Sequence, residues 1–361
     1  MSGKQFKNHR QNDFGGGMNT LKAPTAIQDK EGVLIQNFHS EGSRLIKQPG
    51  YSTYVNANND LEIGPCKVKG MANYKDWLIM VLQRNDATKT YLTLWDLNGS
   101  LENASYRLEI PNYPEEVNVG SYFIGDLYVV VTDQTAQTDL TWAKFDGSAL
   151  TDMTSSVTTL TNKKFSCFGF HKGRSYLGGP TNSPGAFYYS KSSTASTPAD
   201  SYDFGGTGSG ATVVGDGSQY VTGFASRQNV GYIMMSNSVW KITDETATQG
   251  PMISKETGTG PARQNVITNV SQDTFYFDGF NVRRLSYEEN TLALKDTAIA
   301  DDIKNEFLKL PKDQSKACAY FAYPYYKLLL RTSDSDENDI AFVYSVIAKS
   351  WTIQRGISGN C

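Results

Sequence analysis

A short apolar segment with the length of a β-strand occurs six times along the chain, and this repeat restricts the fold more than any other feature of the sequence. The segments are marked by Leu78, Tyr128, Tyr176, Tyr232, Phe275 and Leu328. Successive markers are 43 to 56 residues apart, and each is followed by a turn and a further strand-like segment. A period near 50 residues is typical of the four-stranded blades of a β-propeller.

The composition agrees with many strands joined by tight turns, because 12% of the 361 residues are aromatic and 32 are glycine. The repeated segments are continuously apolar, as expected for sheets buried on both faces. We therefore predict an all-β protein, a β-propeller of about six four-stranded blades. One short helix is predicted over 301–310, between the fifth and sixth blades, because acidic residues begin this segment and Pro311 follows it.

The two ends of the propeller are predicted from the segments that do not follow the repeat. Residues 1–32 are polar and belong to no blade, so we expect an extended N-terminal arm, with the propeller over 33–361. Propellers commonly close by combining strands from both chain ends. Strands in 33–55 are therefore predicted to pair near 341–353. The glycine-rich stretch 205–217 is predicted to be a long loop.

The charge and the motifs give little sign of catalysis or of nucleic-acid, nucleotide or metal binding. The chain has 34 basic and 37 acidic residues, without the basic excess of a general nucleic-acid clamp. The glycine-rich run 205–210 is not followed by the Gly-Lys-Ser/Thr of a phosphate loop. The segment 334–345 begins like a calcium loop, but Asp339 and Ser345 stand where Gly and Glu are needed. We predict no catalytic, metal or cofactor site, and we expect that the protein is not an enzyme.

The cysteines and the N-terminus bear on the cellular setting. Cys66, Cys167 and Cys318 each precede a marker by about ten residues, which predicts buried, free thiols on first strands. The three histidines and four cysteines lack the spacing of a zinc site. The N-terminus has no apolar signal core, and the apolar runs are strand-sized. We expect a protein made in the cytoplasm without a membrane anchor.

Several short phrases occur in a recognisable order. Residues 14–20 read Phe-Gly-Gly-Gly-Met-Asn-Thr, and 44–51 end in Pro-Gly-Tyr. Further on, 214–224 opens on Gly-Asp-Gly after Val214, and 275–285 reads Phe-Tyr-Phe-Asp-Gly-Phe-Asn-Val-Arg-Arg-Leu. A strand pair over 343–351 ends the series. Together these phrases resemble the β-propeller virion proteins of tailed bacteriophages, although Met18 replaces a leucine and Lys47-Gln48 replace a more basic run.

The resemblance implies a structural role in the tail nozzle, the tail hub or the head closure of a virion. Expected partners are other virion proteins of the tail or neck and copies of the same chain in a ring around the DNA path. DNA would pass without sequence-specific contacts. The protein would be made in the cytoplasm of the host bacterium and end in the virion. Members of this family are often longer, so the position in the particle stays open.

The resemblance begins inside the arm, which suggests an interface there. Its residues are Phe14, Gly15, Gly16, Gly17, Met18 and Asn19. The glycines allow the backbone to bend or to pass close to another chain. We predict that the arm orders against a neighbouring subunit, with the aromatic and methionine side chains as anchors. The alternative is a disordered tail, because so polar a segment cannot fold alone.

Two other functions remain open. The 21 tyrosines and 5 tryptophans could line sugar sites of a ligand-binding propeller, such as a lectin or a receptor-binding protein. The same side chains could instead fill the spaces between blades. A third hypothesis is an enzyme on the propeller scaffold, because the fold does not decide the function.

Overall fold

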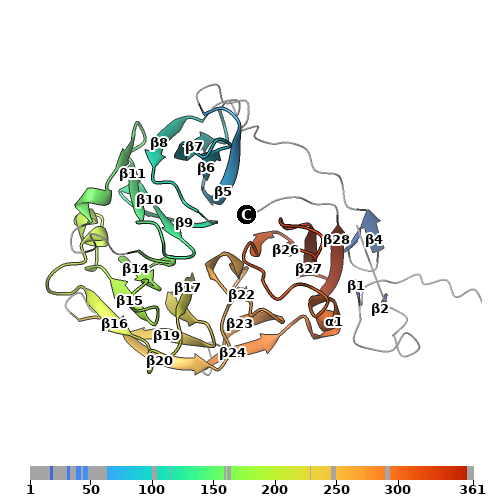
Figure 1. The fold of residues 1–361 in the computed structure, drawn as a ribbon. Coiled ribbons are helices and arrows are strands. Elements are labelled where there is room, and N and C mark those ends of the chain that lie inside the picture. The colour runs from blue at the N-terminus through green and yellow to red at the C-terminus, as the bar shows by residue number, and fades with distance from the viewer. Residues whose placement is uncertain are drawn as a thin grey trace, which may run out of the picture. The chain divides into compact units, whose positions relative to one another are not determined.

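The strands form six four-stranded sheets, as the computed structural model in Figure 1 shows. The structure describes residues 63–99, 104–114, 116–157, 160, 164–227, 229–244, 249–288 and 293–355, together with the strand residues 17–18, 31–32, 38–41 and 44–47. Each four-stranded sheet consists of four strands that are consecutive in the chain. The predicted all-β fold, a six-bladed β-propeller, is confirmed.

The strands of the six sheets have the following bounds. The first sheet contains β5 (Cys66–Tyr74), β6 (Trp77–Arg84), β7 (Thr90–Asp96) and β8 (Tyr106–Ile110), and the second β9 (Val117–Ile124), β10 (Asp126–Asp133), β11 (Thr141–Phe145) and β12 (Leu150–Asp152). The third contains β13 (Cys167–His171), β14 (Arg174–Gly178), β15 (Ala186–Tyr189) and β16 (Gly210–Val213), and the fourth β17 (Val221–Arg227), β18 (Val230–Met235), β19 (Ser238–Asp244) and β20 (Met252–Thr257). The fifth contains β21 (Ile267–Val270), β22 (Asp273–Phe277), β23 (Val282–Glu288) and β24 (Ala293–Ala298), and the sixth β25 (Cys318–Ala322), β26 (Tyr325–Leu330), β27 (Ile340–Ser345) and β28 (Ser350–Arg355).

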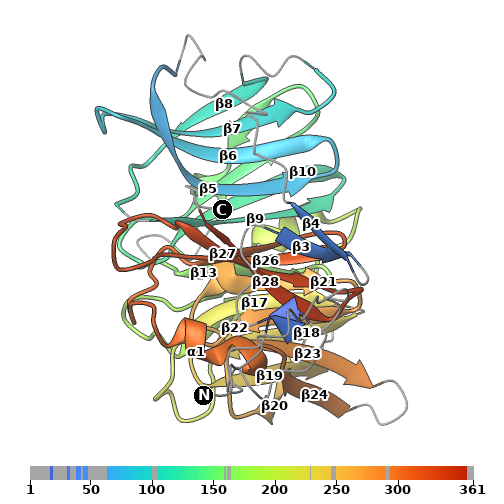
Figure 2. The same cartoon turned by 90° about the vertical axis from the view of Figure 1, so that its right-hand side faces the viewer.

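The second strand of each sheet carries much of the core, as the repeat predicts. All six markers lie in second strands, from Leu78 in β6 to Leu328 in β26. The side chains of Tyr128, Tyr176 and Phe275 are nearly fully buried. Apolar side chains of the first two sheets pack face to face in one cluster, and both views show these sheets side by side (Figures 1 and 2). Burial on both faces explains why these strands are continuously apolar.

The chain divides into two compact units. The larger unit comprises Tyr51–Gly279, Arg283–Thr297 and Asn360–Cys361, and the smaller comprises Met1–Gly50, Phe280–Val282 and Ala298–Gly359. The larger unit holds the first four sheets and most of the fifth, and the smaller holds the sixth.

Within the larger unit, neighbouring first strands approach one another at glycines. A Cβ atom on Gly120 of β9 would lie 2.2 Å from Cδ1 of Phe168 in β13. Equivalent positions are Gly70 against Val117, Gly169 against Phe224 and Gly223 against Ile267, with distances of 2.3 to 2.5 Å. One glycine in each of the first four sheets therefore receives a side chain of the next sheet. These glycines recur about every 50 residues, and this second repeat was not recognised among the sequence patterns above.

The smaller unit contains the described strands of the N-terminal segment. β3 (Phe38–Glu41) and β4 (Arg44–Lys47) form an antiparallel hairpin, and the backbone of β3 lies beside β27 and β28. The predicted strand 44–46 lies in β4, whereas 34–37 lie outside the described residues. β3 and β4 form a sheet of their own, and the sixth sheet is complete without them. Closure of the propeller by 33–55 stays a prediction.

The other helices and connections are short. The predicted helix over 301–310 is present in part, as η6 (Asp301–Ile303) and α1 (Lys304–Phe307), between the fifth and sixth sheets in the chain, and it ends three residues earlier than predicted. The amide of Asn281 donates to Asp301 at 2.7 Å, at the start of this segment. The remaining short 3-10 helices are η3 (Thr154–Ser156), η4 (Pro198–Tyr202) and η5 (Gln264–Val266).

Two sequence-based expectations need correction. The stretch 205–217 is not a single loop, because Gly210–Val213 form β16, the fourth strand of the third sheet. An outer strand needs backbone partners on one side only, so its sequence can lack an apolar pattern. Cys66 and Cys167 are not disulfide-bonded and begin first strands, as predicted, but only Cys167 is fully buried, whereas Cys66 is half-buried. Cys318 also begins a first strand, but it is disulfide-bonded to a residue outside the described part of the chain.

Candidate functional site

The predicted assembly interface falls mostly outside the described residues. Phe14, Gly15, Gly16 and Asn19 are not described, and nothing in the structure tests their role. Gly17 and Met18 form β1, which pairs in parallel with β2 (Glu31–Gly32) and whose backbone lies beside β28. The arm interface stays a prediction.

A cavity of about 240 Å³ lies at one end of the first two sheets, within the larger unit. Three hairpin turns line it: the turn between β5 and β6, the turn between β9 and β10, and the turn between β11 and β12. The lining residues are 74–77, Phe123, 125–127 and 145–147. All three turns belong to neighbouring sheets, so the cavity results from the packing of one blade against the next.

Aromatic rings form one wall of this cavity. The rings of Tyr74 and Phe123 are stacked, with centroids 6.0 Å apart and an interplanar angle of 11°. The Lys75 ammonium lies 5.3 Å from the first centroid and 5.2 Å from the second, within the range of a cation–π contact. Trp77 meets Phe145 edge to face, with centroids 4.8 Å apart. Phe123 is nonetheless 49% exposed, so much of its surface faces solvent.

Three carboxylates stand around the aromatic wall, one from each turn: Asp76, Asp126 and Asp146. Asp126 forms an ion pair of 2.7 Å with the ammonium of Lys144, and its hydrogen bond raises the pKa of Lys144. Hydrogen bonds from the backbone N–H and side chain of Ser148 lower the pKa of Asp146 to about 2. The Asp146 carboxylate is therefore charged at neutral pH.

Two glycines keep the cavity open. Gly125 and Gly147 have φ angles of +73° and +93°, which other residues rarely adopt. No heavy atom lies within 4 Å of the position that a Cβ would take at either glycine. The turns thus leave space beside the rings instead of filling it with side chains.

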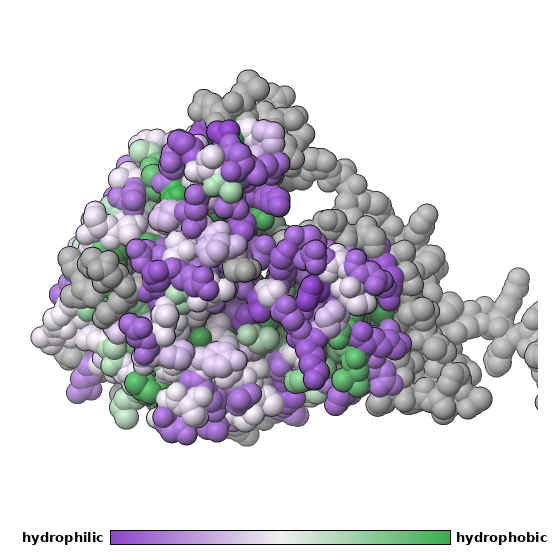
Figure 3. All heavy atoms as spheres, viewed as in Figure 1, coloured by the Kyte–Doolittle hydropathy of each residue, from purple (hydrophilic) through white to green (hydrophobic). Residues whose placement is uncertain are grey.

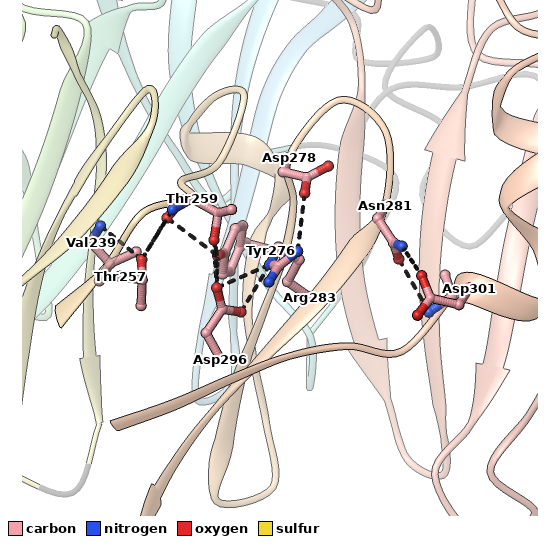
Figure 4. A network of polar contacts seen from close by, with 10 residues as sticks. Val239, Thr257, Thr259, Tyr276, Asp278, Asn281, Arg283, Asp296 and Asp301 are labelled. Atoms are coloured by element: carbon pink, nitrogen blue, oxygen red, sulfur yellow. Dashed lines mark hydrogen bonds and ion pairs between the residues drawn. The ribbon is translucent and has the colours of Figure 1, made fainter. Parts of the chain in front are cut away.

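A polar network joins the fourth and fifth sheets in the larger unit (Figure 4). The Nε atom of Arg283 donates to both carboxylate oxygens of Asp296 at 3.0 Å. The Tyr276 hydroxyl donates to the same carboxylate at 3.1 Å and contacts the Thr259 hydroxyl at 2.9 Å. Asp278 lies 3.8 Å from the Arg283 guanidinium. Since every charged group here has an opposite partner, we interpret this network as a structural contact between blades.

A serine–histidine contact joins the third and fourth sheets. Nδ1 of His171 lies 2.7 Å from the Ser226 hydroxyl. Burial, with a smaller contribution from the nearby Lys172 charge, lowers the pKa of His171 to about 4. A histidine with this pKa is a weak general base at neutral pH. The pair therefore does not support the catalytic hypothesis.

The His171 contact predicts a loss of stability in mild acid. The pKa of His171 in the folded state lies below its unfolded value of 6.5, so the unfolded chain binds more protons below pH 6.5. Between pH 7 and pH 5 this linkage should lower the free energy of unfolding by about 2 kcal/mol. Urea unfolding at both pH values measures the loss, and His171→Gln should remove most of it. An equal pH dependence in both proteins would contradict the prediction.

Polar side chains also connect the second and fifth sheets, which have two other sheets between them along the chain. The guanidinium Nη1 of Arg263 donates to Oε1 of Gln134 at 2.7 Å. The amide of Asn265 donates to the backbone oxygen of Val117 at 3.4 Å. Both residues of the fifth blade lie just before its first strand, β21. These contacts therefore join the segment before β21 to the end of the second sheet where Val117 pairs with Asp133.

The described surface shows few other candidate sites. Hydrophilic residues are spread over the face seen in Figure 3, with residues of intermediate hydropathy and hydrophobic residues between them. Among the described residues, no three His, Cys, Asp or Glu side chains are grouped so that they could hold a metal ion. No helix within the described ranges is long and apolar enough to span a membrane.

Comparison with known proteins yields only distant structural likeness. No protein-family model and no curated protein sequence matches the chain. Among solved structures, it is similar to a quinoprotein alcohol dehydrogenase-like protein from Bacteroides thetaiotaomicron. The two share 11% sequence identity with a TM-score of 0.44, over 81% of this chain and 67% of that chain.

Proposed function

We propose that this protein is a structural component of a tailed-phage virion, in the tail or neck assembly around the DNA path. The observation that carries the proposal is the occurrence of the arm phrase at 14–20 and the blade phrase at 275–285 in one chain. The blade phrase covers β22 and β23, and its Arg283 and Arg284 pair with aspartates of the same sheet. That part of the phrase is therefore a determinant of the fold, whereas the arm phrase is the part that suggests assembly.

The contacts inside the larger unit bear on where DNA would pass. Arg263–Gln134 and Asn265–Val117 join the second and fifth sheets directly. A DNA duplex, whose major groove alone is about 12 Å wide, cannot pass between side chains in hydrogen-bond contact. The proposal therefore has several copies of the chain surround the DNA, with no duplex inside a single propeller.

The arm provides the test of this role. Deletion of residues 1–20 removes the whole 14–20 phrase and should leave a folded propeller that no longer enters rings or particles. Deletion of residues 1–10 is the matched control, because it shortens the arm but keeps the phrase. Circular dichroism checks folding, and negative-stain microscopy with mass spectrometry of purified particles measures assembly. Normal incorporation of the chain without residues 1–20 would contradict the prediction that the arm orders against a neighbouring subunit.

A second candidate function is a ligand-binding propeller of the lectin or receptor-binding kind. The observation that favours it is the cavity beside Phe123, which is lined by aromatic rings, by carboxylates and by turns whose glycines leave space free. Small-ligand sites combine an apolar wall with a few polar groups that orient the ligand. The two functions are compatible, because a protein of a virion surface can also bind a ligand.

A further inference from the structure

We infer that the cavity between the turns of the first two blades binds one ring of a neutral saccharide. This inference rests on the second candidate function and is independent of the virion role. The volume of about 240 Å³ is below the range of roughly 300–1,000 Å³ that encloses drug-sized ligands. The cavity therefore suits a single sugar ring, with the rest of an oligosaccharide in solvent.

The aromatic wall matches the apolar face of a pyranose. Aromatic rings offer a large, rigid apolar surface, and the C–H groups of one sugar face pack against such a surface. Phe123 is held in place by stacking on Tyr74, yet it is 49% exposed. Its ring is thus oriented before a ligand arrives, which reduces the entropy lost on binding.

The carboxylates match the hydroxyl groups at the edge of a sugar ring. A hydroxyl both donates and accepts hydrogen bonds, whereas a carboxylate only accepts and an ammonium only donates. Asp76, Asp126 and Asp146 come from three different turns. The Lys144 ammonium pairs with Asp126, and the Lys75 ammonium lies over the aromatic wall. These described carboxylates do not converge on a point where a metal ion could bind. Their separation favours a ligand with several hydroxyls over a single cation.

The charge of the site favours a neutral sugar over an acidic one. Three carboxylates against two ammonium groups leave one negative charge at the cavity. The turn at Asp146 keeps its carboxylate ionised, because Ser148 and Ala149 donate three hydrogen bonds to it. A sugar carboxylate placed in the cavity would be repelled by the like charge.

Binding of saccharides to the full chain tests the inference. The probes are a panel of neutral saccharides that includes lactose and N,N'-diacetylchitobiose, with sialyllactose as the acidic probe, each measured by saturation-transfer NMR and calorimetry. We expect a neutral probe to bind at millimolar concentration and sialyllactose to bind more weakly than lactose. Phe123→Ala should weaken binding by at least about tenfold, and Phe280→Ala, at a 61% exposed phenylalanine outside the cavity, should leave it unchanged.

Several outcomes would overturn the inference. These are no binding of any neutral probe up to about 10 mM, equal affinity in wild type and in folded Phe123→Ala, or tighter binding of sialyllactose than of lactose. If Phe123→Ala does not fold, Asp76→Asn replaces it, because Asp76 is exposed. This variant should bind the neutral probes more weakly, and its affinities for lactose and sialyllactose should differ less than those of the wild type. Affinities for both saccharides that equal the wild-type values would also overturn the inference. The Phe123→Ala variant should still assemble into rings of several copies of the chain. A negative result for saccharide binding therefore leaves the virion proposal standing.

Discussion

Replacement of Arg174 by methionine is expected to lower the free energy of unfolding by about 3–5 kcal/mol, because hydrogen bonds to a charged group each contribute about 1.5–3 kcal/mol. Arg174 is 1% exposed. Its guanidinium donates to the backbone oxygens of Ser190 at 2.6 Å, of Gly208, and of Gln249 at 3.2 Å. The side chain thus joins the third sheet to the segment before β20 in the fourth. Methionine fills similar space but leaves these buried oxygens without this donor.

The matched control for Arg174 is Arg284→Met. Arg284 also has an oxygen partner, Asp273 at 2.7 Å, but its side chain is 44% exposed. Exposed ion pairs contribute about 0–1 kcal/mol, so this variant should lose less than about 1 kcal/mol. Chemical denaturation of both variants measures the difference. Similar losses in the two proteins would mean that the buried guanidinium is not a main contact between the sheets.

Gly120→Ala is expected to cost about 3 kcal/mol, the upper part of the usual range for added volume in a packed core. The new methyl group would lie 2.2 Å from Cδ1 of Phe168. That ring cannot move freely, because it packs edge to face on Trp142 with centroids 5.7 Å apart. Thermal or urea unfolding gives the loss directly.

Two further variants show whether this loss comes from the contact between the sheets. Gly258→Ala should change stability by no more than about 0.5 kcal/mol, because no heavy atom lies within 4 Å of its Cβ position. Phe168→Leu alone should lower the stability of the protein. In the double variant with Gly120→Ala, however, the total loss should be smaller than the sum of the two single losses, because the effects of substitutions at residues in contact are not additive. Additive losses in the double variant would contradict the proposed clash.

The strands that pack on both faces could be predicted, and those that pack on one face could not. β10 and β18 are continuous apolar segments with turn residues at their ends, so their pattern is local and readable. β16 consists of Gly210–Val213 in a glycine-rich stretch, and it is a strand only because β15 offers it backbone partners. The glycines at 70, 120, 169 and 223 could have been noticed as a repeat. Their role as receptors for side chains depends on the neighbouring sheet.

The candidate cavity was not predictable from the sequence. Residues 74–77, Phe123, 125–127 and 145–147 look like ordinary hairpin connections, and nothing in their spacing indicates that they meet. The predicted arm interface at Phe14 to Asn19 came from resemblance and not from a local pattern. The buried Arg174 was also missed, because a lone arginine beside a strand is usually solvated.

The sequence by itself determined the all-β class, the repeat of about six units and the positions of their second strands, because apolar runs and turn residues act over about ten residues. The tertiary structure alone decided which side chains meet. The contacts that define the sheets' packing and the cavity join residues about 50 positions apart, and the Arg263–Gln134 contact joins residues 129 positions apart. No local pattern encodes such pairs. They arise when successive sheets stack, which sets a glycine against a phenylalanine, a guanidinium against distant carbonyls, and three turns around one cavity.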